Sequence, residues 1–117
     1  MQKKAWPALD VETTLTGTPN QIEWAKQIRL TVAQEFDRVV KVLEAQVRIQ
    51  TGQQEAETRT IIAILEQKRA ATMSIPSAGY FIRVWRDLND QVRQMISEDP
   101  GYHLIRAQRE ARRRAAV

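Results

Sequence analysis

Residues 18–47 read TPNQIEWAKQIRLTVAQEFDRVVKVLEAQV, a stretch that predicts one long amphipathic helix. Thr18 can cap this helix, Pro19 suits its first turn, and Gln21 completes a capping box. Beyond this start, apolar residues recur at steps of three and four, which places them on one face of a helix of roughly thirty residues. They are Ile22, Ala25, Ile28, Val32, Phe36, Val39, Leu43 and Val47. We expect the helix to end near Gly52, because glycine suits a left-handed cap.

Three further helices are predicted after this one. Residues 53–72 form the second, with an apolar face that begins only after two polar turns. Pro76 ends it, because the residue before a proline is driven out of helical geometry. The third helix is expected at 77–97, with these apolar residues on one face: Phe81, Val84, Trp85, Leu88, Val92, Met95 and Ile96.

A short fourth helix is expected at 100–114. It starts at Asp99-Pro100 and turns Leu104, Ile105 and Ala111 inward. Residues 1–17, by contrast, suggest an irregular lead-in. The whole chain, 1–117, is thus expected to be a single all-α domain of three to four helices in an antiparallel, bundle-like arrangement. Its long first helix either projects beyond the others or pairs with a second copy as a homodimer.

Composition narrows the class of protein. The chain has no cysteine, which excludes disulfides and thiolate metal sites. No apolar run approaches the ~20 residues needed to span a bilayer. The basic N-terminus lacks the hydrophobic stretch of a secretory signal. We therefore expect a cytoplasmic protein, in a bacterial host cell, with no membrane partner.

Residues with the usual catalytic chemistry are scarce. His103 is the single histidine and is interpreted as a surface or capping residue. Asp87 and Asp90 share a helix face, but arginines surround them, so surface ion pairing is the preferred interpretation. The four glycines are too scattered to form a phosphate-binding loop. The sequence therefore predicts a protein that is not an enzyme, with no catalytic, cofactor-binding or metal-binding residues.

Basic charge is concentrated at the C-terminus. Residues 1–100 hold equal numbers of acidic and basic residues, and the excess lies in 101–117, interpreted as a basic C-terminal helix or tail. Its arginines are the main candidates for partner binding: Arg106, Arg109, Arg112, Arg113 and Arg114. Such a stripe can neutralise nucleic-acid phosphates or bind an acidic protein surface. The alternative is a solvated terminus whose charge aids solubility.

The three tryptophans have different predicted roles. Trp85 belongs to the core of the third helix. Trp24 lies off the apolar face of the first helix, and either packs against the lead-in or stands exposed as an interface anchor. Trp6 precedes a proline in the lead-in, and is the aromatic residue most suited to partner binding.

Two stretches resemble a family of small proteins common in phages and mobile elements. Residues 15–29, LTGTPNQIEWAKQIR, are similar to its opening, L-x-G-S/T-x-x-Q-I-x-W-A-x-x-I-R. Residues 77–85 are similar to its second signature, S-A-K-x-W-I-D-x-R, at Ser77, Ala78 and Ile82, with an aromatic residue kept at 81. Arg83 and Trp85 stand where the family has its Asp and Arg, so any role of that polar pair is expected to be lost.

The resemblance implies a function. Some small helical proteins with this opening look like phage-encoded inhibitors of CRISPR–Cas immunity, which bind effector subunits stoichiometrically. We therefore expect a macromolecule-binding protein of phage or mobile-element origin, an anti-CRISPR whose partner is a Cas subunit. The alternative is a small DNA- or RNA-binding accessory or regulatory protein that uses the basic C-terminal helix.

Overall fold

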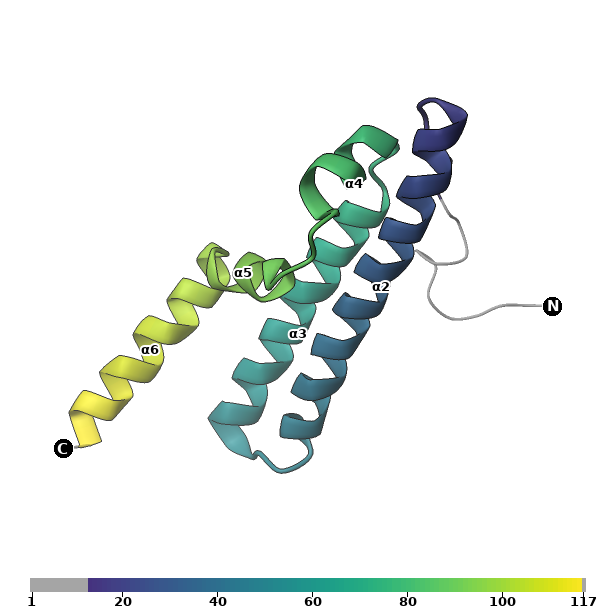
Figure 1. The fold of residues 1–117 in the computed structure, drawn as a ribbon. Coiled ribbons are helices and arrows are strands. Elements are labelled where there is room, and N and C mark those ends of the chain that lie inside the picture. The colour runs from purple at the N-terminus through teal and green to yellow at the C-terminus, as the bar shows by residue number, and fades with distance from the viewer. Residues whose placement is uncertain (1–12, 117) are drawn as a thin grey trace.

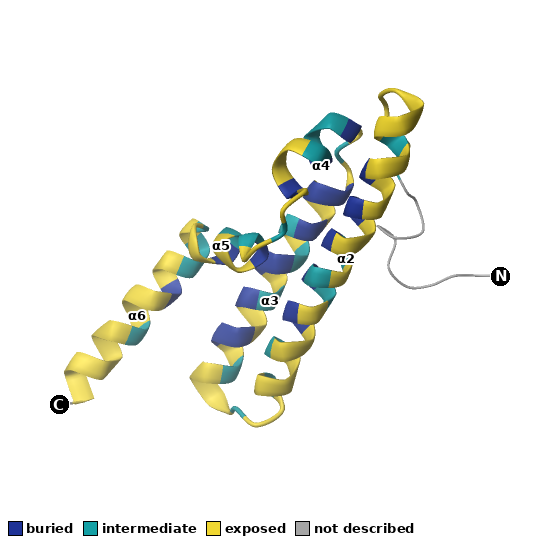
Figure 2. Ribbon diagram, viewed as in Figure 1, coloured by how far each residue is buried: buried dark blue, intermediate teal, exposed yellow. Residues whose placement is uncertain are grey.

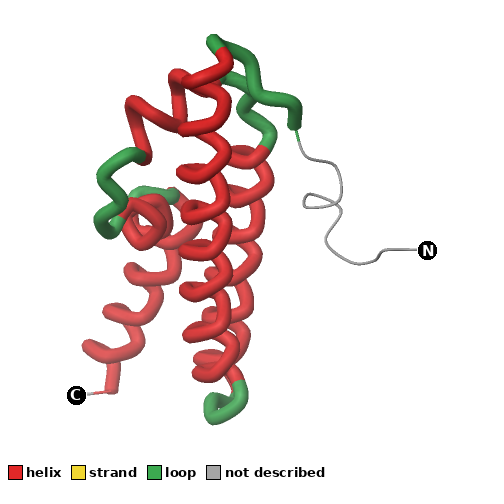
Figure 3. Tube along the Cα trace, turned by 45° about the vertical axis from the view of Figure 1, so that its right-hand side comes forward, coloured by secondary structure: helices red, strands yellow, loops and turns green. Residues whose placement is uncertain are grey.

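A computed structural model describes residues 13–116 of the chain, which contain five helices. The two longest, α2 (Pro19–Val47) and α3 (Gly52–Met73), run side by side in opposite directions as a hairpin (Figure 1). Both lie antiparallel along most of their lengths in the turned view as well (Figure 3). The predicted all-α class is thus confirmed. The described part holds five helices, however, where the sequence predicted three to four.

The start and inner face of α2 follow the sequence. The Thr18 hydroxyl accepts from the backbone N–H of Gln21, whose side chain accepts from the N–H of Thr18 in return, which completes the capping box. All eight apolar positions of the predicted face are buried or half-buried, and Figure 2 shows the buried and exposed stretches of α2 alternating along the ribbon. Phe36 and Val32 are fully enclosed. Burial of this face is the main source of stability for the hairpin.

The connection between α2 and α3 begins earlier than predicted. The helix ends at Val47 rather than near Gly52. Residues Ile49 and Gln50 donate to carbonyls three residues back, so the chain leaves the helix through tighter turns. Gly52 does take the expected left-handed conformation, with φ of 61°, but it opens α3 instead of capping α2.

Helix α4 (Ala78–Trp85) covers the upper half of α2. The Ser77 hydroxyl caps it by accepting from the N–H of Tyr80, 3.1 Å away. Trp85 is buried as predicted, with its ring centroid 6.2 Å from that of Phe36 on α2. Its indole N–H donates to the Tyr80 hydroxyl at 3.0 Å, so the one polar atom of the ring is satisfied inside the core.

The predicted single helix at 77–97 is wrong. The chain breaks after Trp85 and resumes as α5 (Gln91–Ser97). The Gln91 side chain holds the break: it donates to the Val84 carbonyl at 2.9 Å and accepts from the Asn89 N–H at 2.7 Å. Asp and Asn in this stretch favour such turns over helix. Val84, expected on the apolar face, lies in the last turn of α4 and is 41% exposed.

Helix α6 (Pro100–Ala116) leads away from the body (Figure 1). It contacts α3 and α5, and Ile105 is its one buried residue. Leu104 and Ala111 were expected to face inward, and both are exposed, because the body covers only the side of α6 on which Ile105 lies. Among residues 13–116, no helix is long and apolar enough to cross a bilayer.

The segment before α2 is clasped to the start of α4. Thr16 and Ser77 form a parallel bridge, in which the Thr16 N–H donates to the Pro76 carbonyl at 2.8 Å and the Ala78 N–H donates to the Thr16 carbonyl at 3.0 Å. Gly17, with φ of 147°, lets the chain pass so close that a Cβ there would lie 3.3 Å from that of Ala78. The two stretches that carry the family resemblance therefore lie against each other.

Candidate partner-binding surface

Asp99 both caps the start of α6 and holds it on the body. Asp99 caps the helix, since its carboxylate accepts from the Gly101 N–H at 2.7 Å. The same carboxylate lies 2.9 Å from the Lys68 ammonium on α3. These two interactions lower the pKa of Asp99, the ion pair with Lys68 contributing most. Further along, Ile105 packs into the core, and beyond it the helix depends on a different kind of contact.

That contact joins the C-terminal arginines to one buried carboxylate. Glu57, in the second turn of α3, is only 4% exposed. Arg109 approaches it at 2.9 Å and Arg112 at 2.8 Å, both from α6. Gln53 adds a longer hydrogen bond of 3.5 Å from its own helix. Two of the five arginines predicted to bind a partner are thus engaged within the chain.

The environment of Glu57 contains opposing effects on its pKa. Burial of the carboxyl disfavours the charged form and would by itself raise the pKa. Hydrogen bonds from Arg109 and Arg112 favour the carboxylate and outweigh burial, so the pKa of Glu57 lies below its usual value. The group is therefore ionised at neutral pH, and it holds the middle of α6 toward α3.

The other residues predicted to bind a partner differ in their contacts and exposure. Arg114 lies 3.8 Å from Glu110, one turn back on the same exposed helix. Arg106 and Arg113 are exposed and form no ion pair with any residue in 13–116. Trp6 lies outside the described residues. Trp24 is 47% exposed, which corresponds to the alternative of an exposed aromatic on α2.

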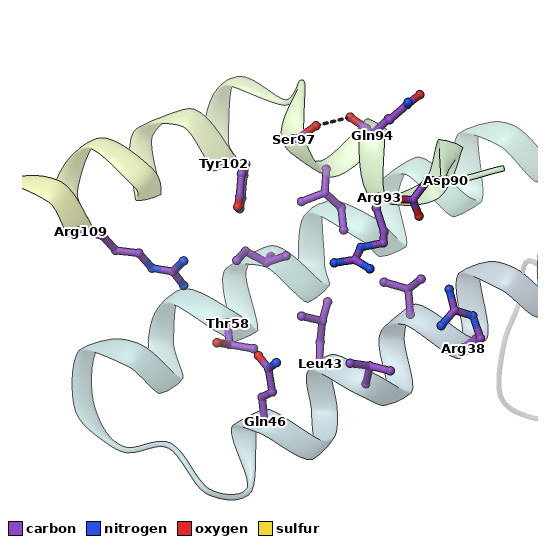
Figure 4. Close-up of a pocket in the computed structure, with 14 residues that line it drawn as sticks. Arg38, Leu43, Gln46, Thr58, Asp90, Arg93, Gln94, Ser97, Tyr102 and Arg109 are labelled. Atoms are coloured by element: carbon purple, nitrogen blue, oxygen red, sulfur yellow. Dashed lines mark hydrogen bonds between the residues drawn. The ribbon is translucent and has the colours of Figure 1, made fainter.

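A pocket opens where α5 and α6 part from the hairpin (Figure 4). Its cavity volume is about 500 Å³, within the usual range for ligand sites. Aliphatic side chains from α2, α3 and α5 line it: Val39, Val42, Leu43, Ile61 and Ile96. Val42 is 49% exposed, so part of this apolar lining is open to solvent.

Charged and polar side chains surround this lining. Figure 4 shows Arg93 and Tyr102 reaching from α5 and α6 toward the hairpin, with Arg109 at one end of the pocket and Arg38 at the other. Asp90 is the one acidic residue among those that line it. The result is a pocket of mixed character, in which aliphatic side chains and three guanidinium groups lie close together.

The three arginines differ in how far they are already engaged. The Arg38 Nε–H donates to Glu35 at 3.0 Å, an interaction that raises the pKa of Arg38 and lowers that of Glu35. Arg109 uses its Nε–H on Glu57. Arg93 forms no ion pair with a residue in the described range. Because each guanidinium carries five N–H donors, all three retain donors for a ligand.

Candidate residues for catalysis are dispersed. His103 is exposed in the first turn of α6. Asp87 lies 3.7 Å from Arg86 on the surface, in agreement with the ion-pairing interpretation. Across residues 13–116, no three His, Asp or Glu side chains gather in a way that could hold a metal ion. The pocket, by contrast, brings side chains from α2, α3, α5 and α6 together at one place.

Comparison of the chain with protein-family models, with curated proteins and with solved structures found no match.

Sequence reasoning did not identify Glu57, Arg38 or Arg93 as parts of a site. One signal for Glu57 was present, because it precedes Ile61 and Leu65 by one and two turns and so shares their buried face. A carboxylate on an apolar face needs a partner, and the only cationic excess lies in the C-terminal helix. The two pocket arginines had no such signal, because their grouping depends on the angle at which α5 crosses the hairpin.

Proposed function

We propose that this chain works by binding another macromolecule, without a reaction of its own, and that the partner is a protein. The pocket supports this proposal. Its apolar lining suits the side chains of a peptide, whereas phosphate groups would gain nothing from it. Arginine at the edge of a partly buried apolar patch is typical of protein interfaces.

A capture experiment with paired variants tests the proposal. Val42→Glu places a charge on the half-exposed lining of the pocket, and Leu30→Glu makes the same change on α2 outside the pocket, at a residue that is 56% exposed. We expect the wild-type chain and Leu30→Glu to retain the same protein from a bacterial lysate after nuclease treatment, and Val42→Glu to lose it. Equal retention by all three variants would refute a role for the pocket.

A finer proposal concerns the identity of the partner. The resemblance of residues 15–29 and 77–85 supports a phage or mobile-element origin, and with it an anti-CRISPR that inhibits a Cas effector subunit. The test is capture from a CRISPR-active host together with phage plating in that host. If no Cas subunit is captured and the number of phage plaques does not rise, the anti-CRISPR proposal is refuted, while the proposal of a protein-binding function is unaffected.

A second candidate function is nucleic-acid binding through α6, favoured by the exposure of Arg106 and Arg113. The proper test removes these two and not Arg109 or Arg112, which hold α6 to Glu57. Removal of one phosphate-binding arginine should reduce the slope of log affinity against log salt by about 1. Arg83→Gln, an exposed arginine on α4, is the matched control. An unchanged slope in the Arg106→Gln/Arg113→Gln double variant would exclude this use of the helix.

A further inference from the structure

The pocket combines two chemistries that a single kind of partner can satisfy. Its lining from α2 extends from Arg38 to Gln46, which is about 12 Å, or two turns of helix. Aliphatic side chains lie between the arginines, so a ligand that reaches the apolar lining passes directly beside guanidinium groups (Figure 4). A ligand with only apolar groups would leave those N–H donors without acceptors. A ligand with only anionic groups would leave the aliphatic side chains exposed to water.

Arg93 is the central element of this arrangement. It projects from α5 over the space between α5 and the hairpin, and it pairs with no carboxylate in the described part of the chain (Figure 4). Arg38 and Arg109 flank it and are each oriented by a carboxylate behind them, Glu35 and Glu57, neither of which lines the pocket. Their remaining N–H donors are thus held near the pocket at little further entropic cost.

We propose that the pocket binds a short acidic amphipathic helix of a partner protein, whose aliphatic or aromatic side chains enter the apolar lining and whose carboxylates pair with Arg93, Arg38 and Arg109. This inference rests on the proposed function and adds the chemistry of the partner to it. Helix-in-groove binding places anchors at steps of three and four residues, and two turns of lining accommodate two or three such anchors. Carboxylates between those anchors then meet the arginines.

The probe is a displayed library of helical peptides with leucine or phenylalanine at anchor spacing and Glu, Gln or Lys at each intervening position. Selection is carried out on the full-length chain in about 50 mM and about 200 mM salt, a range over which ionic contacts weaken measurably. We expect Glu to be enriched beside the anchors, more strongly at the lower salt concentration. Enrichment of Lys, no preference among the three, or no enriched peptide would overturn the proposal.

Binding of the enriched peptide is then measured by fluorescence anisotropy against two arginine variants. Arg93→Gln should weaken it by about tenfold, the loss expected for one charge-assisted contact. Arg83→Gln removes the same charge from α4 and should change it by less than about twofold, as expected for an exposed charge away from the site. Equal weakening by both variants would mean a general charge effect and would refute a specific site.

The outcomes also separate this inference from the broader function. If Val42→Glu abolishes capture of a cellular protein while the library shows no preference for Glu, the pocket is a protein-binding site and the acidic helix is wrong. If an oligonucleotide competes with the enriched peptide and its binding also depends on Arg93, the ligand is a nucleic acid and both proposals fail.

Discussion

The pairing of Glu57 with α6 leads to a quantitative prediction for Glu57→Gln. The amide has nearly the same volume as the carboxylate, so packing of the side-chain stem is kept and only the charge is removed. Two charge-assisted contacts then weaken, each of the kind that contributes about 1.5–3 kcal/mol when well shielded. The arginine side chains are 33% and 43% exposed, so both can return to water when released. We therefore expect a loss of stability below the sum of two such contacts, about 2 kcal/mol.

The loss of stability in Glu57→Gln should be confined to α6, because beyond Ile105 this helix has little other contact with the body. Two kcal/mol corresponds to about a thirtyfold rise in the opening equilibrium. Hydrogen exchange of the backbone amides in 106–116 should accelerate by that factor, while amides in the buried middle of α2 change little. Glu110→Gln is the matched control, since it removes an exposed pair with Arg114 at 3.8 Å and should have almost no effect.

The same carboxylate makes the attachment of α6 depend on pH. The folded-state pKa of Glu57 lies below its unfolded value, so the stabilisation is complete above the unfolded pKa of about 4.3 and is lost as pH falls through the folded pKa. Protection of the α6 amides should therefore decrease below about pH 4.3 in the wild type and less so in Glu57→Gln. Equal acceleration of α2 and α6, or no acceleration at all, would refute the idea that Glu57 holds this helix.

Substitutions at three further positions test the fold. Gly17→Ala should destabilise the protein by about 1–3 kcal/mol, because the φ of 147° is unfavourable for alanine and the added Cβ would lie 2.9 Å from the Gln21 amide oxygen. Urea denaturation measures this loss, and an unchanged stability would contradict the close approach of the chain at Gly17. Thr18→Ala removes the cap of α2 and should cost about 1 kcal/mol by the same assay, whereas Thr18→Asp should restore most of it. Phe36→Ala should cost about 3–5 kcal/mol, since its side chain is fully buried; a loss below about 1 kcal/mol would show that the core collapses into the space.

Local signals in the sequence predicted the start and the apolar face of α2 correctly, but they did not predict the break between α4 and α5. Thr18 and Gln21 act on neighbouring backbone groups, so their effect is visible in the sequence itself. At the break, Trp85, Val92 and Ile96 are all buried even though no continuous helix joins them. Apolar spacing alone therefore could not distinguish one helix from two, and the hydrogen bonds of Gln91 decided the outcome.

The candidate site was predictable only in part. Charge concentration identified the C-terminal arginines, but it could not show that Arg109 and Arg112 turn inward to Glu57, fifty-two residues before Arg109. The pocket depends on how α5 and α6 cross the hairpin, which is a property of tertiary packing. Its arginines come from three different helices and share no pattern in the sequence.

The clasp between Thr16 and Ser77 bears on the order in which the chain folds. The α2–α3 hairpin needs only the short connection at 48–51 to close, so its contacts can form early. The bond from Thr16 to Pro76, by contrast, closes a loop of sixty residues and can form only once both long helices are in place. Substitutions at the contact between Thr16 and Ser77 should therefore change the refolding rate little and accelerate unfolding. This contact thus helps to set the lifetime of the native state.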